Sequence, residues 1–261
     1  MIIQFVAAVS IYASSPDADP GARAKASVDQ IRSGVPMCFQ EEDALVFVGS
    51  TDSSLVECLQ SAPSQTRKLR ITSNGGDAAL AIQAARMVTA RNYALIVRGV
   101  CFSACANYLV PAARSLEVEP YSIVGLHGAP EEGEAFIKLI QDEVERQQRQ
   151  AFPDVSEALV AEGRAKMRDI VVGIVASHKQ FAIDHDVGGG WYSLKDFHTD
   201  VAAFGPNDFA VVDPAYLARH VPQLQVVDFW SPADARDREI LAENAHGAAL
   251  HYRNQAIDEE L

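Results

Sequence analysis

Residues 68–90 have the sequence KLRITSNGGDAALAIQAARMVTA, and this stretch decides the fold class. Its first five residues, KLRIT, are typical of a strand. The Asn-Gly-Gly core of residues 73–77 predicts a turn. Residues 77–90 predict a helix, because they are rich in alanine and begin with Asp77, a residue suited to cap a helix N-terminus. We therefore expect a strand, a turn and a helix in immediate succession.

The segments on either side continue this alternation. Compact apolar runs predict further strands over residues 44–50, 93–99 and 121–127. Residues 53–61 and 103–112 predict helices, the second broken near its proline. Strands and helices that alternate at such short intervals predict right-handed βαβ crossovers and a mostly parallel sheet covered by helices. We therefore expect an α/β protein.

The chain divides into three parts by its pattern. Residues 1–43 are expected to form a leader or candidate signal segment followed by a short helix. Residues 44–230 are expected to form the sheet-bearing domain, with a charged, helical insertion at 131–185. Residues 231–261 are expected to form an acidic, helical tail with solvated charges.

Composition and charge exclude several kinds of partner. The chain of 261 residues has a net charge of −13, which disfavours nucleic acid because phosphate contacts need clustered Lys and Arg. The same charge disfavours anionic membrane surfaces. No apolar run approaches the roughly 20 residues that span a bilayer. We expect a globular protein with a sizeable core.

The N-terminal run MIIQFVAAVSIYA, residues 1–13, has two interpretations. It resembles the apolar region of a signal peptide with a small-residue exit near Ala13, although a positive region would then have to precede it. It is equally consistent with a buried first strand. The first interpretation predicts a periplasmic or secreted protein and the second a cytoplasmic one, and the sequence leaves both open.

The four cysteines, Cys38, Cys58, Cys101 and Cys105, are too few for a disulfide scaffold. Their spacing matches no zinc motif, and we expect no metal and no cofactor. Export would permit Cys38–Cys58 or Cys101–Cys105 bridges, whereas a reducing compartment would favour buried free thiols.

Three chemically useful segments each follow an expected strand. They are the glycine turn SNGGD, the serine of GVCFSAC, which is Ser103, and His127. Because the carboxyl ends of parallel strands meet at one edge of a sheet, we expect the three to converge. A serine at a helix start is a candidate nucleophile if a base lies beside it, and otherwise a helix cap. Likewise, His127 is either that base or a hydrogen-bonded core residue, and the paired glycines are either an anion-binding turn or a plain one.

Three segments, LRITSNGGDAALAIQAARMV, GVCFSACANYL and YSIVGLHGAP, resemble the proteolytic subunit of the Clp protease and its relatives. These relatives include the signal-peptide peptidase A-type enzymes of the crotonase-like superfamily. The resemblance covers residues 44–130, and a weaker similarity extends over residues 191–213. It implies a ClpP/crotonase-like fold in which Ser73-Asn74-Gly75-Gly76 stands where the family has Ser-Pro-Gly-Gly.

The resemblance implies a serine peptidase that forms an acyl-enzyme. Ser103 would attack the peptide carbonyl, and His127 would accept its proton. Backbone amides of Gly75 or Gly76 and of Ala104 would stabilise the oxyanion. The peptide or protein substrate would bind as an added strand beside the glycine turn.

Further expectations follow from the same resemblance. Cys101 and Cys105 are expected to shape the turn around Ser103, as a disulfide if they are bridged, while a cysteine nucleophile is the rival to Ser103. The segment after the His127 strand builds contacts between subunits in Clp-type enzymes, so we expect a homo-oligomer. The chain has no GxxxxGK[ST] motif, so an ATP-driven unfoldase would be a separate protein.

The chain departs from the family pattern at three positions. Asn74 replaces a proline, and Asp77 brings a carboxylate close to the oxyanion position unless it only caps the helix. The acid that would orient His127 is the third departure: Asp186 is our candidate, with Asp184 in reserve. These departures keep two rival functions open, a catalytically inactive binding or scaffold protein of this fold and a crotonase-type acyl-CoA enzyme.

Overall fold

A computed structural model describes residues 19–130, 133–192, 197, 207–245 and 247–253. The strands are β1 (Met37–Glu41), β2 (Ala44–Val48), β3 (Lys68–Ser73), β4 (Ala94–Phe102), β5 (Ser115–Val118), β6 (Ile123–Leu126), β7 (Asp208–Val211), β8 (Gln225–Phe229) and β9 (Ala249–Tyr252). The α-helices are α2 (Pro20–Arg32), α3 (Ser53–Ser61), α4 (Ala78–Ala90), α5 (Val110–Ala112), α6 (Glu134–Ala151), α7 (Glu157–Asp184), α8 (Pro214–His220) and α9 (Ala235–Asn244). A π-helical turn, η1 (Cys105–Leu109), and a 3₁₀ turn, η2 (Gly189–Tyr192), complete the described elements.

The described strands form one sheet that forks at β4. Its main path runs β1-β2-β3-β4-β6-β7-β9, and β5 and β8 branch from β4. The first half of β4 pairs with β5 and the second half with β6, both in parallel. Only the β1–β2 and β6–β7 pairs are antiparallel. The predicted α/β class with a mostly parallel sheet is confirmed.

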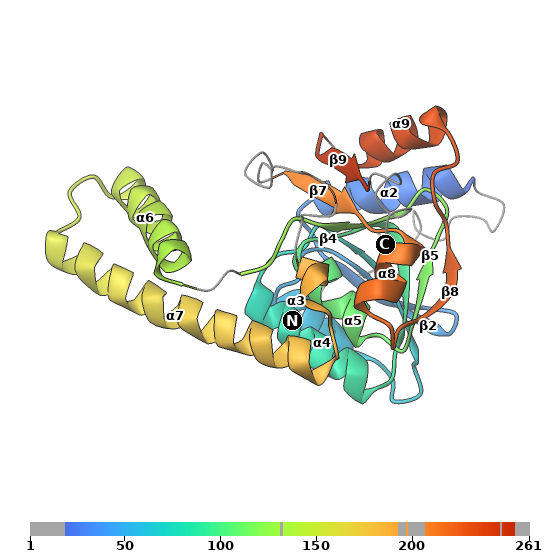
Figure 1. Cartoon of the computed structure of the whole chain (residues 1–261), viewed down its shortest axis with the longest axis horizontal. Helices are drawn as coiled ribbons and strands as arrows, with labels where there is room; N and C mark the ends of the chain where they lie inside the picture. Colours follow the sequence, from blue (N-terminus) through green and yellow to red (C-terminus); the bar gives the residue numbers. More distant parts are fainter. Residues whose placement is uncertain (1–18, 131–132, 193–196, 198–206, 246, 254–261) are drawn as a thin grey trace, which may run out of the picture.

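Crossover helices connect the central parallel strands as the alternating pattern predicts (Figure 1). Helix α3 links β2 to β3, and helix α4 links β3 to β4. Asp52 and Asp77 cap these two helices, and the Asp77 carboxylate accepts a hydrogen bond of 2.9 Å from the Leu80 amide. The predicted boundaries of α3 agree with the structure, whereas β4 continues past the predicted end at residue 99 to Phe102.

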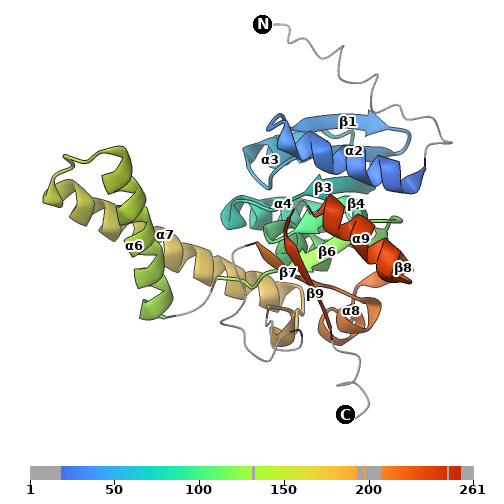
Figure 2. The same ribbon diagram turned by 90° about the horizontal axis from the view of Figure 1, so that it is seen from above.

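A second layer covers the opposite face of the sheet. Helices α2 and α9 lie side by side there, although they come from opposite ends of the described chain (Figure 2). Their apolar residues pack against Val100, Phe102 and Ile123 in a separate small core. Strand β9, in the segment expected to be an acidic helical tail, pairs with β7 and so extends the sheet. The sequence pattern did not predict β9, because it is short and only partly buried.

Helices α6 and α7 form an arm that extends away from the sheet (Figures 1 and 2). They lie in the segment for which the sequence predicts helices. Arg164 joins the two helices through Nη1, which lies 2.8 Å from Asp142 and 2.6 Å from Glu145. Arginine donors lower the pKa of Glu134 and Glu145, and hydrogen bonds from Arg146 lower that of Glu143 to about 2. These three carboxylates therefore stay ionised across the neutral and mildly acidic range.

The base of the arm is anchored to the sheet-bearing body by aromatic side chains. Phe181 of α7 packs edge-on against the buried Tyr108 of η1, with the ring centroids 5.3 Å apart. The Tyr108 hydroxyl lies 3.3 Å from Nδ1 of His178. Burial raises the pKa of Tyr108, so this hydroxyl stays neutral.

The chain contains two disulfides and no free cysteine. Cys38 of β1 is joined to Cys58 of α3, and Cys101 of β4 is joined to Cys105 of η1. These are the two pairs that the sequence leaves open under export. Residues 1–18, which carry the candidate signal segment, lie outside the described residues. No helix in the described part of the chain is long and apolar enough to cross a membrane.

Candidate active site

The glycine turn that follows β3 packs directly against Ser103. Gly75 has a φ of 89°, and a Cβ atom added to it would lie 2.6 Å from the Cβ of Ser103 and 2.7 Å from the carbonyl oxygen of Phe102. Contacts this short exclude any side chain at Gly75. The ends of β3 and β4 are therefore held together by a contact that only glycine permits.

Ser103 occupies a strained turn between β4 and η1. Its φ of 54° is in the left-handed region, which costs most residues other than glycine free energy. Its amide donates a hydrogen bond of 3.0 Å to the Gly125 carbonyl, and its carbonyl accepts one of 2.8 Å from the Asn107 amide. A strained serine whose backbone is fixed on both sides is characteristic of functional sites.

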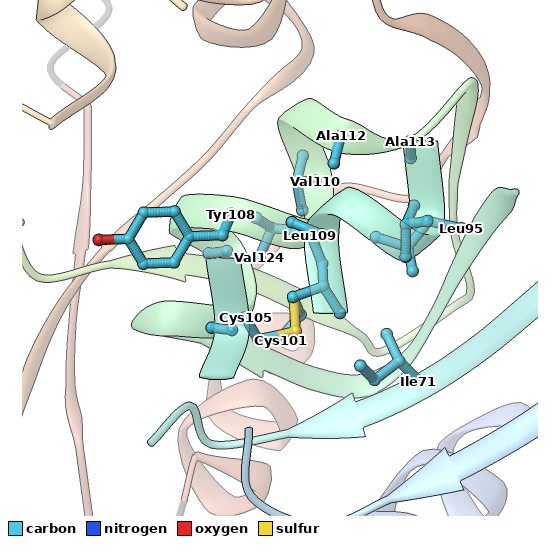
Figure 3. Packing of buried hydrophobic residues seen from close by; sticks show 14 of the residues in the cluster. Ile71, Leu95, Cys101, Cys105, Tyr108, Leu109, Val110, Ala112, Ala113 and Val124 are labelled. Carbon is cyan, nitrogen blue, oxygen red and sulfur yellow. A yellow bond between two sulfur atoms is a disulfide. The ribbon is translucent and has the colours of Figure 1, made fainter. Parts of the chain in front are cut away.

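A disulfide spans this turn. Figure 3 shows the Cys101–Cys105 bond among the buried side chains of β4 and η1. Both cysteines are fully buried, at 0% exposure. The bond connects the next-to-last residue of β4 to the first residue of the π-helical turn, so it restricts the backbone on both sides of Ser103. Since all four cysteines are bridged, the rival cysteine nucleophile is excluded, and the hydroxyl is the reactive group available in this segment.

His127 reaches the same pocket from the neighbouring strand. It follows the last residue of β6, its side chain is exposed, and its ring centroid lies 5.3 Å from that of Phe209. Ser103 and His127 both line a pocket of about 430 Å³. The structure shows no direct hydrogen bond between these two described side chains, which share the lining of the pocket. The structure therefore brings together the two side chains that the parallel topology predicts to converge.

Apolar and polar side chains both line this pocket. Phe102 and Phe209 stack with their ring centroids 4.2 Å apart, and both line the pocket. Val28 of α2 and Ala245, which follows α9, complete the apolar wall. Polar side chains also line the pocket: Arg32, Asn74, Asn207 and Asn244. The two helices of the second layer thus enclose a site whose reactive groups come from the sheet.

The backbone donors near Ser103 are not equivalent. The Gly75 amide donates to the Ser73 hydroxyl at 3.2 Å, and the Gly75 carbonyl accepts from the Thr51 amide at 2.8 Å. The amides of Gly76 and Ala104 are therefore the better candidates for binding an anion. The Ala104 amide lies directly beside Gly75, 3.0 Å from the position of an added Cβ. The carboxylate of Asp77 caps α4, which explains how it is accommodated beside this turn.

The structure does not bring Asp186 to this pocket. Its neighbour His185 contacts the Thr89 hydroxyl through Nε2 at 2.9 Å, near the C-terminal end of α4. The glycine turn precedes the opposite end of α4, about 18 Å away at 1.5 Å per residue. Asp184, the reserve candidate, accepts a hydrogen bond from Gln180 in the last turn of α7. The long helix α7 returns the chain to the wrong edge of the sheet for either carboxylate to orient His127.

The described pocket lining contains no Asp or Glu. Across the described residues, no cluster of three or more His, Cys, Asp or Glu side chains is arranged to hold a metal ion. Ser103 and His127 are the lining side chains that could serve as a nucleophile and a base.

Sequence reasoning missed the residues that complete the pocket. Val28, Asn207, Asn244 and Ala245 come from segments far from Ser103 in the chain. It also missed Asn107, a buried side chain whose Nδ2 donates to the Gly128 carbonyl at 2.8 Å. One signal was present for Asn107: it is a polar amide within the otherwise apolar run of residues 104–113.

The fold and the site define a class: an α/β protein with a serine and a histidine at one edge of a mostly parallel sheet. No protein-family model and no curated protein matches the sequence. Solved structures do match. AtuE of Pseudomonas aeruginosa is 11% identical with a TM-score of 0.30, and the match covers 57% of this chain and 81% of that one.

Two further matches are proteins provisionally assigned as enoyl-CoA hydratases. The one from Rhodopseudomonas palustris is 13% identical with a TM-score of 0.33, and the match covers 88% of this chain and 78% of that one. The one from Mycobacterium avium paratuberculosis is 14% identical with a TM-score of 0.27, over 64% of this chain and 93% of that one. At these values the matches carry no argument about activity, and the fold rests on the strand order and connections described above.

The strain at Ser103 can be tested by substitution. We expect Ser103→Gly to be more stable than Ser103→Ala by about 1 kcal/mol, because glycine adopts a positive φ without a Cβ clash. Thermal unfolding should show a melting temperature that is higher by about 2–4 °C for the glycine variant. Ser64 is exposed and has no positive φ, so Ser64→Gly should instead be less stable than Ser64→Ala. A lower melting temperature for Ser103→Gly than for Ser103→Ala would contradict the conclusion that the Ser103 backbone is strained.

Proposed function

We propose that this protein is a serine hydrolase that cleaves peptide bonds through an acyl-enzyme. The observation that carries the proposal is the position of Ser103: it stands in a strained turn, packed against a glycine turn, and lines one pocket with His127. A serine that only caps a helix would need neither a positive φ nor a histidine in the same pocket. A nucleophile needs an accessible hydroxyl, a base nearby and donors for the developing charge.

In the proposed reaction, the Ser103 oxygen attacks the carbonyl carbon of the substrate while His127 accepts the hydroxyl proton. The carbonyl oxygen becomes an oxyanion, which the amides of Gly76 and Ala104 would stabilise. His127 then returns the proton to the leaving amine, and the acyl group stays on Ser103. Water activated by His127 hydrolyses this ester and restores the free hydroxyl.

The lack of an acidic partner for His127 in the described pocket lining has a kinetic consequence. In a triad the acid fixes the tautomer of the histidine and stabilises its charged form, and replacing it can lower kcat by about 10⁴-fold. A serine–histidine pair without that acid is expected to turn over slowly. A covalent probe that reports a single reaction of Ser103 is therefore a better test than a turnover assay.

The pocket lining supports a choice of substrate. Phe102, Phe209 and Val28 provide an apolar surface beside Ser103, and the volume of about 430 Å³ suits one large side chain. We propose that the residue supplying the scissile carbonyl places an apolar side chain there. The substrate backbone would lie beside the glycine turn as an added strand, as the resemblance to Clp-type peptidases implies.

Labelling with a fluorophosphonate probe tests the nucleophile. We expect the wild-type protein to gain one covalent adduct, and Ser103→Ala to gain none because the attacking oxygen is gone. His127→Ala should label about 10²- to 10⁴-fold more slowly, the usual contribution of a general base. Intact-mass spectrometry and peptide mapping measure both effects. Ser64→Ala, which removes an exposed hydroxyl elsewhere, should label at the wild-type rate.

The two rival functions are outcomes of the same experiment. A folded wild-type protein that takes up no probe would contradict the hydrolase and favour a catalytically inactive binding or scaffold protein. Turnover of CoA thioesters with Ser103→Ala still active would favour a crotonase-type acyl-CoA enzyme, because that chemistry uses glycine-turn amides without a serine nucleophile. Neither outcome would alter the fold.

Filling the pocket tests the proposed side-chain preference. Ala248 is half-buried in the pocket lining, so Ala248→Trp should occupy part of the space. We expect the rate with a leucine ester or peptide substrate to fall by at least about 10-fold, while an alanine substrate keeps most of its rate, since a few methylenes are worth roughly 10- to 200-fold. Fluorogenic substrates that differ only in this side chain provide the measurement. Equal losses for both substrates would contradict the assignment of the pocket.

We also propose that the chain forms a homo-oligomer through its arm. Leu139, Phe152 and Leu159 are exposed there, at 64%, 67% and 54%, and Ile183 near its base reaches 73%. Sedimentation velocity should show a species larger than the 28.2 kDa monomer, and Phe152→Glu with Leu159→Glu should reduce it. A monomer at all concentrations would contradict the proposal.

A further inference from the structure

Asn107 is placed where it links the two chain segments that carry Ser103 and His127. Its backbone amide donates to the Ser103 carbonyl at 2.8 Å. Its side-chain Nδ2 donates to the Gly128 carbonyl, also at 2.8 Å, one residue beyond His127. A single residue therefore fixes the start of η1 and the end of the β6 segment relative to each other.

The His127 segment needs such a restraint. Strand β6 ends at Leu126, and the described residues between it and α6, which begins at Glu134, belong to no helix or strand. Gly128 has a φ of 99°, and, apart from its chain neighbours, no described residue has an atom within 4 Å of the Cβ that a larger residue would have there. Apart from the ring contact with Phe209, the bond from Asn107 is the restraint that the described residues provide for this turn.

Packing alone does not explain an asparagine at this position. Asn107 is 3% exposed, and its Oδ1 atom is buried without a hydrogen-bond partner among the described residues. A buried, unpaired carbonyl oxygen lowers stability, whereas leucine of similar volume would bury no polar side-chain atom. Positions that break a local rule in this way are most often functional.

We propose that Asn107 is a positioning residue that holds His127 beside Ser103 through its hydrogen bond to the Gly128 carbonyl, an inference that rests on the proposed serine hydrolase. Asn107 touches neither the substrate carbonyl nor the transferred proton. It fixes the backbone from which the exposed imidazole reaches the pocket. Loss of this hydrogen bond should slow proton transfer to His127 and leave binding of the fluorophosphonate probe unchanged.

Asn107→Leu removes the amide donor at nearly constant volume. Fluorophosphonate labelling is measured over a range of probe concentrations, which separates the maximal labelling rate from the apparent binding constant. We expect the maximal rate to fall by about 10- to 100-fold, the cost of misplacing a catalytic group by around 1 Å, with the binding constant unchanged. Asn107→Gln keeps an N–H donor and should recover part of the rate.

Thr72→Val is the matched control. Thr72 is 1% exposed, and its hydroxyl donates to the Arg98 carbonyl at 2.6 Å, so the variant also removes a buried bond between a side chain and a carbonyl. Neither Thr72 nor Asn107 lines the pocket. We expect Thr72→Val to lower the melting temperature and to label at the wild-type rate when assayed below that temperature. If Asn107→Leu does not fold, Asn107→Ser replaces it, because serine is too short to reach Gly128.

Amide hydrogen exchange gives a readout that does not depend on activity. Exchange in peptides covering residues 121–130 should increase in Asn107→Leu and stay unchanged in Thr72→Val. If the wild-type protein takes up no probe, the proposed function fails, and hydrogen exchange alone decides whether Asn107 restrains the His127 segment. Wild-type labelling rates in Asn107→Leu, or unchanged exchange over residues 121–130, would overturn the positioning role.

Discussion

The contact between Gly75 and Ser103 is the constraint on which the rest of the site depends. The two backbones approach so closely that a Cβ on Gly75 would overlap the Ser103 side chain. This approach joins the ends of β3 and β4, the strands at the centre of the sheet. It also places the Ala104 amide beside the glycine turn. A substitution at Gly75 would therefore disturb the turn, the serine and the donor together.

Several unfavourable features meet around this contact. Ser103 has a left-handed backbone, and Asn107 buries an unpaired oxygen. The Cys101–Cys105 disulfide closes so short a segment that its entropic effect on the unfolded chain is smaller than that of Cys38–Cys58, since this effect grows with loop length. Its main effect is then local, on the turn that it spans. Strain and restraint concentrated at one turn are better explained by the needs of a site than by the stability of the sheet.

Much of the fold and the centre of the site could be predicted because they depend on local patterns. Alternating strands and helices determine a parallel sheet, and a parallel sheet brings the ends of β3, β4 and β6 to one edge. The pocket walls could not be predicted, because α2 and α9 meet only through the tertiary structure. The position of Asp186 could not be predicted for the same reason: it depends on where the 28-residue helix α7 returns to the body, and no spacing in the sequence encodes that.

The environment of His127 indicates how the proposed site could work with no triad acid among the described pocket residues. A buried carboxylate normally orients the imidazole and stabilises its positive charge. Here the imidazole is exposed, so water can solvate the charge that a carboxylate would otherwise balance. Two contacts are then left to orient the imidazole: its ring contact with Phe209, and the hydrogen bond from the Asn107 side chain to the Gly128 carbonyl. They fix the position of the ring but not which of its nitrogens carries the proton. Under the proposed function, we expect acylation of Ser103 at a reduced rate, because the tautomer of His127 must be selected anew in each cycle.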